Sequence, residues 1–553
     1  MQRLIARRSL AAVAVVALFA AALARPADAG VNFTSGKVYV QQKVWDKACH
    51  FLELARQEEP DNLQVYSLLA FARAQMNQYA SSGAAFAIGL KMAEAKKDDK
   101  RAKELTVNRN AVAYQLFNKG VGALNRAGRE IAQDESRTTD DGTPQAAVEK
   151  ERGAPKDFAR FTENGQVQEF WYYPDAGVGY YFGPGATAPE KFDYKPYAGA
   201  PDPEQAITDT TVYGEYQGGS KVAEAAYDFT LTSFVDSKSS TSADTYKNLS
   251  YVFEVLGRAD DAMTAARLGL AIKPGDPMLS RNMRVAAMGR GNRLFNAGQY
   301  VESVPAYRKA WEADPDSKML YLSQIADAYF RAGDRMDKEK EGPARTAVLD
   351  SAITAFRYLY DQAPPDSGTM RENALYNIAV IYSNREDYKN AAATLDVAVG
   401  AFPNNFELLS LAGQTKYQAN DWTGALEMLK RALAENPKDE TVHQFLFLTY
   451  NKLGKKDESV GEYSLYKALN GGKLKTGATL KTWIDAAGNR LGANNQLKAT
   501  MQKEGGAYPD EVRTYTDENG KQIETWFYWT KGKAVTFLDG QLLSQTTFPP
   551  AKS

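Results

Sequence analysis

Residues 404–437 read NNFELLSLAGQTKYQANDWTGALEMLKRALAENP, and this stretch decides the fold of most of the chain. Small residues at Gly413, Ala425 and Ala432 would let two helices approach closely, and Leu429 would fill the gap left between them. Pro437 stops the second helix, because proline has no amide hydrogen to donate and clashes with the preceding turn. The segment therefore predicts a helical hairpin.

The pattern recurs along the chain with its spacing preserved. Its copies occupy residues 36–60, 250–274, 291–315, 379–403 and 413–437, and the last two end on Pro403 and Pro437, which are 34 residues apart. Weaker copies lie near 70–86, 326–364 and 450–463. Residues 106–128 are expected to form the first helix of another hairpin whose partner helix is displaced. A polar residue just after the proline, such as Asp61, Asn404 or Asp439, is expected to cap the next helix.

One hairpin cannot cover its own apolar face, so neighbouring hairpins are expected to stack into a superhelix with a concave inner surface. A helical hairpin repeated every 34 residues resembles the tetratricopeptide-repeat (TPR) family, and the resemblance covers roughly 60% of the chain after residue 29. The expected fold is mainly α, a TPR superhelix or α-solenoid. It is interrupted by a small β-sheet module and followed by a related C-terminal one.

The first 29 residues are typical of a signal peptide. Arg3, Arg7 and Arg8 precede an apolar run, and Ala27-Asp28-Ala29 offers a cleavage site. The expected product is exported, to the periplasm of a Gram-negative bacterium, with no membrane span once the signal is removed. The expected organisation is a signal peptide at 1–29, N-terminal hairpins at 30–128, an inserted β-rich module at 129–220, the main array at 221–470, and a C-terminal helix with a β-meander at 471–553.

The two β modules share a motif. Gly165 is followed six residues later by Trp171 and then by Phe182, and Gly520, Trp526 and Phe537 repeat these spacings. Asn-Gly between alternating runs predicts hairpins, because both turn residues need positive φ. Turns at Lys531-Gly532 and Asp539-Gly540 complete a predicted four-strand meander. The motif is similar to small sheet modules of bacterial envelope lipoproteins, including an accessory lipoprotein of outer-membrane assembly. The modules are either docking surfaces or structural caps, and the surface candidates are Trp171, Tyr173, Trp526 and Tyr528.

Composition gives little support for catalysis. Lys and Arg number 67 against 68 Asp and Glu, so no field of one sign favours nucleic acid. Cys49 is the only cysteine and is expected to pack in a core. His50 and His443 are the only histidines, and neither has a motif around it. No catalytic residue, metal site or cofactor is predicted.

The TPR resemblance implies that the first helix of each hairpin lines the groove. Asn and Gln side chains there would hydrogen-bond an extended peptide, and Phe or Tyr would hold an apolar side chain. The partner-groove candidates are Asn248, Asn292, Phe295, Asn296, Gln324, Arg331, Asn377, Gln414, Tyr417 and Gln418. The favoured function is a non-catalytic envelope scaffold that binds proteins or peptides. The alternatives are an enzyme or glycan-binding protein with a site between insert and superhelix, and a structural component without a ligand.

Overall fold

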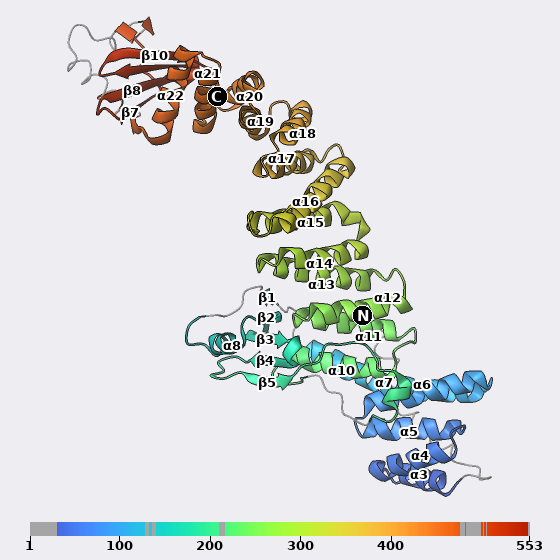
Figure 1. The fold of residues 1–553 in the computed structure, drawn as a ribbon. Helices are drawn as coiled ribbons and strands as arrows, with labels where there is room; N and C mark the ends of the chain where they lie inside the picture. The colour runs from blue at the N-terminus through green and yellow to red at the C-terminus, as the bar shows by residue number, and fades with distance from the viewer. Residues whose placement is uncertain are drawn as a thin grey trace. The chain divides into compact units, whose positions relative to one another are not determined.

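The computed structural model describes residues 30–127, 132–134, 140–209, 216–475, 480, 482, 499–500, 503–504 and 506–550. The predicted signal peptide and most of the predicted C-terminal helix lie outside these residues. The chain divides into two compact units that meet in sequence between Tyr321 and Leu322. Each unit is described by itself, and Figure 1 gives the helix and strand labels.

The first unit is built from helical hairpins. In chain order, the paired helices are α3 (Val31–Gln41) with α4 (Trp45–Glu58), α5 (Leu63–Gln75) with α6 (Tyr79–Ala95), α7 (Asp99–Arg126) with α10 (Lys221–Val235), α11 (Ser242–Val255) with α12 (Ala259–Ile272), and α13 (Pro277–Asn296) with α14 (Tyr300–Ala313). The turn η2 (Pro315–Ser317) and the start of α15 (Lys318–Arg335) follow.

The second unit continues the pattern and ends in a sheet. Gly333 of α15 lies against Leu349 of α16 (Gly342–Gln362). The later pairs are α17 (Gly368–Asn384) with α18 (Tyr388–Ala401), α19 (Phe406–Gln418) with α20 (Trp422–Glu435), and α21 (Glu440–Lys452) with α22 (Lys456–Gly471).

One contact recurs inside the hairpins, between a small residue on the first helix and a large one sixteen positions later on the second. A Cβ atom on Gly36, Gly291 or Gly413 would lie 2.7, 2.6 or 2.5 Å from the side chain of Leu52, Tyr307 or Leu429, respectively. The large side chain therefore occupies the space that a Cβ would need. This is the close approach that the sequence pattern predicts.

The turn between the two helices also follows the pattern. Seven positions after the small residue, the backbone enters the left-handed region in every strong copy, at Lys43 (φ 58°), Gly257 (72°), Gly298 (78°), Glu386 (61°) and Asn420 (63°). Gly and Asn adopt this conformation readily, whereas a residue with a longer side chain pays a steric cost.

The predicted helix caps are partly wrong. Asn62 and Asn405, rather than Asp61 and Asn404, accept the amide hydrogen bonds at the starts of α5 and α19, whereas Asp439 caps α21 as predicted. Each capping residue stands two positions after its proline. In α5 and α19 the amide of the cap residue itself closes a turn back to Glu59 or Phe402, which shifts the helix start by one residue.

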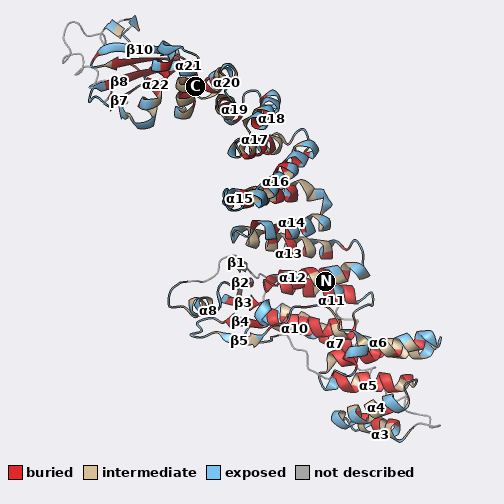
Figure 2. Ribbon diagram, in the orientation of Figure 1, coloured by how far each residue is buried: buried red, intermediate tan, exposed pale blue. Residues whose placement is uncertain are grey.

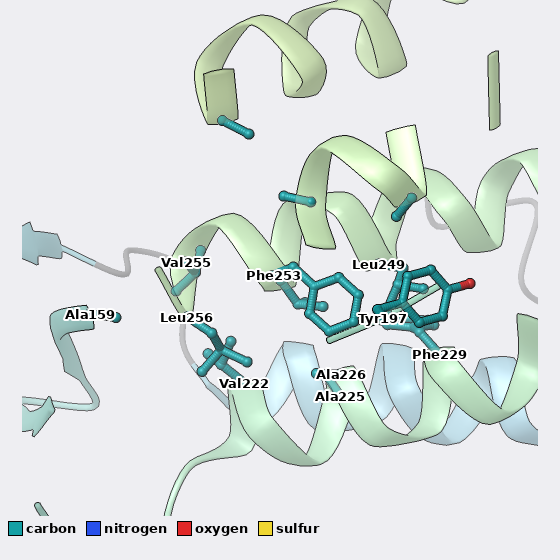
Figure 3. Close-up of a cluster of buried hydrophobic side chains, with 14 of the residues drawn as sticks. Ala159, Tyr197, Val222, Ala225, Ala226, Phe229, Leu249, Phe253, Val255 and Leu256 are labelled. Atoms are coloured by element: carbon teal, nitrogen blue, oxygen red, sulfur yellow. The ribbon is translucent and has the colours of Figure 1, made fainter. Parts of the chain in front are cut away.

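The third hairpin of the first unit is interrupted. Its helices α7 and α10 are separated by residues 127–220, yet a Cβ on Gly120 would lie 2.8 Å from Phe229, as in an uninterrupted repeat. Phe229 also packs in one core with Leu249 and Phe253 of α11 (Figure 3). The insert therefore stands between the two helices of a single repeat, and α10 is the displaced partner of α7.

The insert is a five-stranded antiparallel sheet in the order β1-β2-β3-β4-β5. Its elements are β1 (Ala132–Asp134), α8 (Pro144–Arg152), β2 (Asp157–Glu163), β3 (Gln166–Tyr173), η1 (Pro174–Ala176), β4 (Val178–Phe182), β5 (Glu190–Asp193) and α9 (Pro203–Ala206). One face, with Phe170 and Tyr172, packs on the core shared with α10, α11 and α12. The other, with Trp171 and Tyr173, packs with Val148 of α8. Figure 2 shows the buried centre of this sheet in red.

The C-terminal sheet repeats this arrangement, in the order β10-β9-β8-β7-β6. Its elements are β6 (Lys473–Lys475), β7 (Glu511–Thr516), β8 (Gln522–Tyr528), η3 (Trp529–Lys531), β9 (Lys533–Leu538) and β10 (Gln541–Thr547). The predicted four-strand meander is therefore present, and β6 adds a fifth strand at its edge. The rings of Trp171 and Phe182 lie 5.0 Å apart at 61°, and those of Trp526 and Phe537 lie 5.3 Å apart at 62°.

The two predicted Asn-Gly turns differ. Asn164 and Gly165 both have positive φ, 51° and 77°, as a two-residue hairpin requires. In the Asn519-Gly520 turn of the second module, only Gly520 has a positive φ, of 76°. The carboxylate of Asp517 there accepts from the amides of Asn519 and Lys521 and closes a longer loop.

Candidate binding surfaces

The ten predicted groove residues all lie on the first helices of their hairpins. In the first unit, α11 carries Asn248 and α13 carries Asn292, Phe295 and Asn296; in the second, α15 carries Gln324 and Arg331, α17 carries Asn377, and α19 carries Gln414, Tyr417 and Gln418. Helices α11 and α13 contact each other directly, so the candidates of the first unit lie on neighbouring helices.

Several of these side chains are engaged inside their own repeat. The Tyr307 hydroxyl donates to Oδ1 of Asn292 at 3.0 Å, and the ring of Phe295 packs edge-on against Tyr300 at 5.0 Å. Arg331 forms an ion pair with Asp327 at 2.9 Å. These contacts position the side chains, and they occupy part of the hydrogen-bonding capacity that a ligand would use.

Other candidates remain available. Asn296 and Gln418 stand five residues after the packing glycines Gly291 and Gly413, and both are exposed. Within the described ranges, neither side chain forms a hydrogen bond with another residue. A carboxamide in this position offers two donors and one acceptor to an extended backbone. The same group therefore recurs at one repeat position in each unit.

The aromatic candidate Tyr417 has a neighbour that the sequence interpretation missed. Its ring meets Phe445 of α21 at 5.7 Å in an edge-to-face arrangement. Both residues lie on first helices of successive repeats, and both are half-buried. Phe445 lies outside the repeat positions used for the prediction, so the pattern alone did not select it.

The four β-module surface candidates are wrong as surface residues. Trp171 and Trp526 are 0% exposed, Tyr528 is 2% exposed and Tyr173 is 9% exposed. Strand alternation correctly places each Trp-x-Tyr pair on one face. It cannot reveal that α8 covers that face in the insert, nor that Leu480 packs on it in the C-terminal sheet.

A buried polar cluster fastens the insert to the α11–α12 turn. Arg258 and Asp261 form an ion pair at 2.6 Å with 3% and 2% of their side chains exposed. The Tyr194 hydroxyl and the Tyr197 amide donate to the same carboxylate at 2.9 and 2.8 Å. Burial raises the pKa of Tyr194 and keeps it a neutral donor; Arg258 opposes this shift, and Asp261 adds to it. These insert tyrosines therefore hold the module in place.

His443 is not arranged for catalysis. His443 is fully buried, with Nδ1 2.6 Å from a Glu462 carboxylate oxygen and Nε2 3.0 Å from the Pro437 carbonyl oxygen. The Pro437 carbonyl and the Glu462 carboxylate are both acceptors, so this arrangement favours the protonated imidazolium form of the ring. Burial opposes this charge, but the Glu462 carboxylate and the two hydrogen bonds outweigh it and raise the pKa above 6.5.

The cysteine is equally unsuited to nucleophilic chemistry. Cys49 packs against the core of the first two hairpins, and burial raises the pKa of its thiol to about 11. The thiolate is the reactive form, and little of it is present at neutral pH. Within the described ranges, no three His, Cys, Asp or Glu side chains gather as metal ligands would.

Two cavities in the described part of the chain are lined by residues other than the predicted groove candidates. One, of about 670 Å³, is bounded by Asn77, Tyr79, Leu116, Asn118, Lys119, Gly122, Arg126, Gln217, Glu224, Tyr227, Asp228 and Leu231. The other, of about 310 Å³, is bounded by Arg357, Tyr360, Asp361, Leu375, Ile378, Tyr382, Asn390, Ala393, Thr394 and Val397. None of the ten groove candidates lines either cavity. The first lies in the interrupted repeat and the second in the α16–α18 region.

Residues 384–446, which include α18, α19 and α20, match the family model described as tetratricopeptide repeat. A TPR repeat-containing protein of Methanocaldococcus jannaschii is 24% identical over 182 residues, 33% of this chain, and the chain spans only 30% of that relative's length. Residues 384–446 are therefore similar to tetratricopeptide repeats, and the other hairpins are TPR-like in fold. Proteins built from tetratricopeptide repeats typically mediate protein–protein interactions.

Solved structures with similar hairpins include MamA, with 19% identity over 34% of this chain and 96% of that chain and a TM-score of 0.26. Another is pilF of Pseudomonas aeruginosa, which is 11% identical, with 40% of this chain and 88% of that chain covered and a TM-score of 0.24. A third is the C-terminal part of a TPR protein of Cytophaga hutchinsonii, which is 14% identical, with 45% of this chain and 90% of that chain covered and a TM-score of 0.28. Among the helices that the structure describes, none combines the length and apolar composition of a membrane crossing.

Proposed function

We propose that this protein is a non-catalytic scaffold of the bacterial cell envelope that binds protein or peptide partners along the first helices of its hairpins. The observation that carries the proposal is the recurrence of exposed carboxamides at one repeat position, Asn296 on α13 and Gln418 on α19. Amides bind a peptide backbone without selecting its side chains, which suits a partner held in extended conformation.

Export to the periplasm is part of this proposal and is supported by the residues before Gly30. Three arginines, an apolar run and Ala27-Asp28-Ala29 follow the order of a cleaved signal. Mass spectrometry of the protein purified from its native cells is expected to find a mature chain beginning at Gly30, in the periplasmic fraction. A mature chain that retains residues 1–29, recovered from the cytoplasm, would contradict export.

Partner binding is tested by crosslinking in the native organism followed by mass spectrometry. The wild-type chain is compared with a variant in which Asn296 and Gln418 are replaced by Ala, and with a control in which the exposed second-helix residues Glu427 and Lys430 are replaced by Ala. The groove variant is expected to lose specific partners that the control retains. Equal recovery from all three chains, or no enrichment over an unrelated exported protein, would contradict the proposal.

A further inference from the structure

The cavity of about 670 Å³ in the first unit has the size of a ligand site, since such sites span roughly 300–1,000 Å³. Its walls come from α7 and α10, the two helices of the interrupted repeat, and from the start of α6. Leu116 and Leu231 contribute apolar surface, whereas most of the other lining side chains are polar.

Of the two carboxylates that line this cavity, Glu224 has cationic partners and Asp228 has none among the described residues. Glu224 is neutralised by Arg126 at 2.6 Å and by Lys221 at 2.7 Å. Asp228 stands one helical turn further along α10 and is 7% exposed. Among the described residues its carboxylate has no hydrogen-bond donor and no ion-pair partner within 4 Å. Lys119 on α7 acts on it only at longer range.

A carboxylate that is largely buried and has no donor from the protein is costly, because it has lost part of its hydration without gaining a partner. An ammonium or guanidinium group entering the cavity would supply both the charge and the hydrogen bonds that Asp228 lacks. Around it, Asn118 and Gln217 carry exposed carboxamides that suit the peptide groups flanking a side chain.

We propose that this cavity binds a lysine or arginine side chain of a polypeptide partner, with Asp228 as the acceptor. Only the choice of a polypeptide as the source of the cation rests on the proposed scaffold function. The site is separate from the carboxamides of α13 and α19, since none of those residues lines the cavity.

Binding at this site depends on pH. Burial raises the pKa of Asp228 to about 6, although Lys119 opposes the shift. A cation pairs with the ionised form, so binding is expected to be stronger at pH 7.5 than at pH 5. The titratable and charged groups lining the cavity are Lys119 and Arg126 on α7, Glu224 and Tyr227 on α10, and Tyr79 on α6.

The test uses the purified full chain and the probe acetyl-Ala-Lys-Ala-amide, with binding followed through the methyl NMR signals of Leu116 and Leu231. The probe is expected to bind at pH 7.5, and Asp228→Asn is expected to weaken it at least about tenfold, because a hydrogen bond to a charged group is lost. The matched control is Asp361→Asn, which lies at the other cavity and should leave probe binding unchanged.

A second variant and two further probes complete the test. Lys119→Glu, at an exposed position, is expected to tighten binding of the lysine probe without disturbing the core. Acetyl-Ala-Glu-Ala-amide should not bind, and n-butylamine, which has the single ammonium and alkyl chain of lysine without peptide groups, should bind at least about tenfold more weakly. Absence of lysine-probe binding to the wild type, equal binding by Asp228→Asn, or equal affinity for n-butylamine would overturn the proposal. If the wild-type chain binds the lysine probe but captures no natural partner in the crosslinking experiment, only the scaffold function is contradicted.

Discussion

A Cβ atom placed on Gly413 would lie 2.5 Å from Cγ of Leu429, so the two helices of this hairpin meet where the glycine has no side chain. The same relationship joins Gly291 to Tyr307 and, across the insert, Gly120 to Phe229. In these hairpins it sets how closely the paired helices pack.

Gly413→Ala is therefore expected to destabilise the protein by about 1–3 kcal/mol through overpacking, although Ala normally favours a helix. Gly400→Ala is the matched control, because a Cβ at Gly400 of α18 meets nothing within 4 Å. It should stabilise by up to about 1 kcal/mol. Denaturant unfolding measures both, and a gain in stability for Gly413→Ala would refute the packing argument.

Lys43 holds a left-handed turn, with φ 58°, at the position where Gly257, Gly298 and Asn420 stand in other copies. Lys43→Gly is expected to raise the free energy of unfolding by up to about 1 kcal/mol, because relief of steric strain exceeds the added entropy of the unfolded chain. The reverse change at the equivalent turn of another repeat, Gly298→Lys, should lower the free energy of unfolding. Thermal unfolding of both variants tests this, and parallel shifts in the same direction would argue against it.

The ion pair of Arg258 and Asp261 is buried, and Asp261→Asn would remove the charge of the carboxylate that accepts from the Arg258 guanidinium. The expected loss is about 3–5 kcal/mol, with faster hydrogen exchange around Tyr194 and Tyr197 as the insert loosens. The control Asp260→Asn removes an adjacent carboxylate that is half-exposed and paired with Arg290. It should cost less than about 1 kcal/mol. Similar losses for the two variants would show that burial of the pair is unimportant.

His443 makes stability depend on pH in a defined direction. Its folded-state pKa lies above the ordinary 6.5, so the protonated ring stabilises the fold fully below pH 6.5, and this contribution disappears as pH rises through the folded pKa. Denaturant midpoints of wild type and Glu462→Gln should differ more at pH 5.5 than at pH 9. A difference that grows toward alkaline pH would mean that the buried ring is neutral.

Much of the fold was predictable because repeats place partners at fixed spacing. Gly413 and Leu429 are sixteen residues apart, and the copies at other positions confirm the pairing. Gly120 and Phe229 share the same contact, but the insert hides their spacing, so only a displaced partner could be inferred and not its identity.

The sites were less predictable. Burial of Trp171 depends on α8, which covers one sheet face from outside the strand pattern. The cavity beside Asp228 is formed by α6, α7 and α10 together. In the sequence, Asp228 looks like any polar residue of a helix, and only the structure shows that its carboxylate has no donor among the described residues. The exposed amides Asn296 and Gln418 were found because their position is set by the repeat itself.

The central claim is that partners bind along the first helices. A photo-crosslinking amino acid placed at Gln418 on α19, and separately at Glu427 on α20, compares the exposed positions of one hairpin inside native cells. The account predicts discrete protein adducts from position 418 that position 427 does not give. Adducts of equal yield and identity from both positions, or from 427 alone, would contradict it.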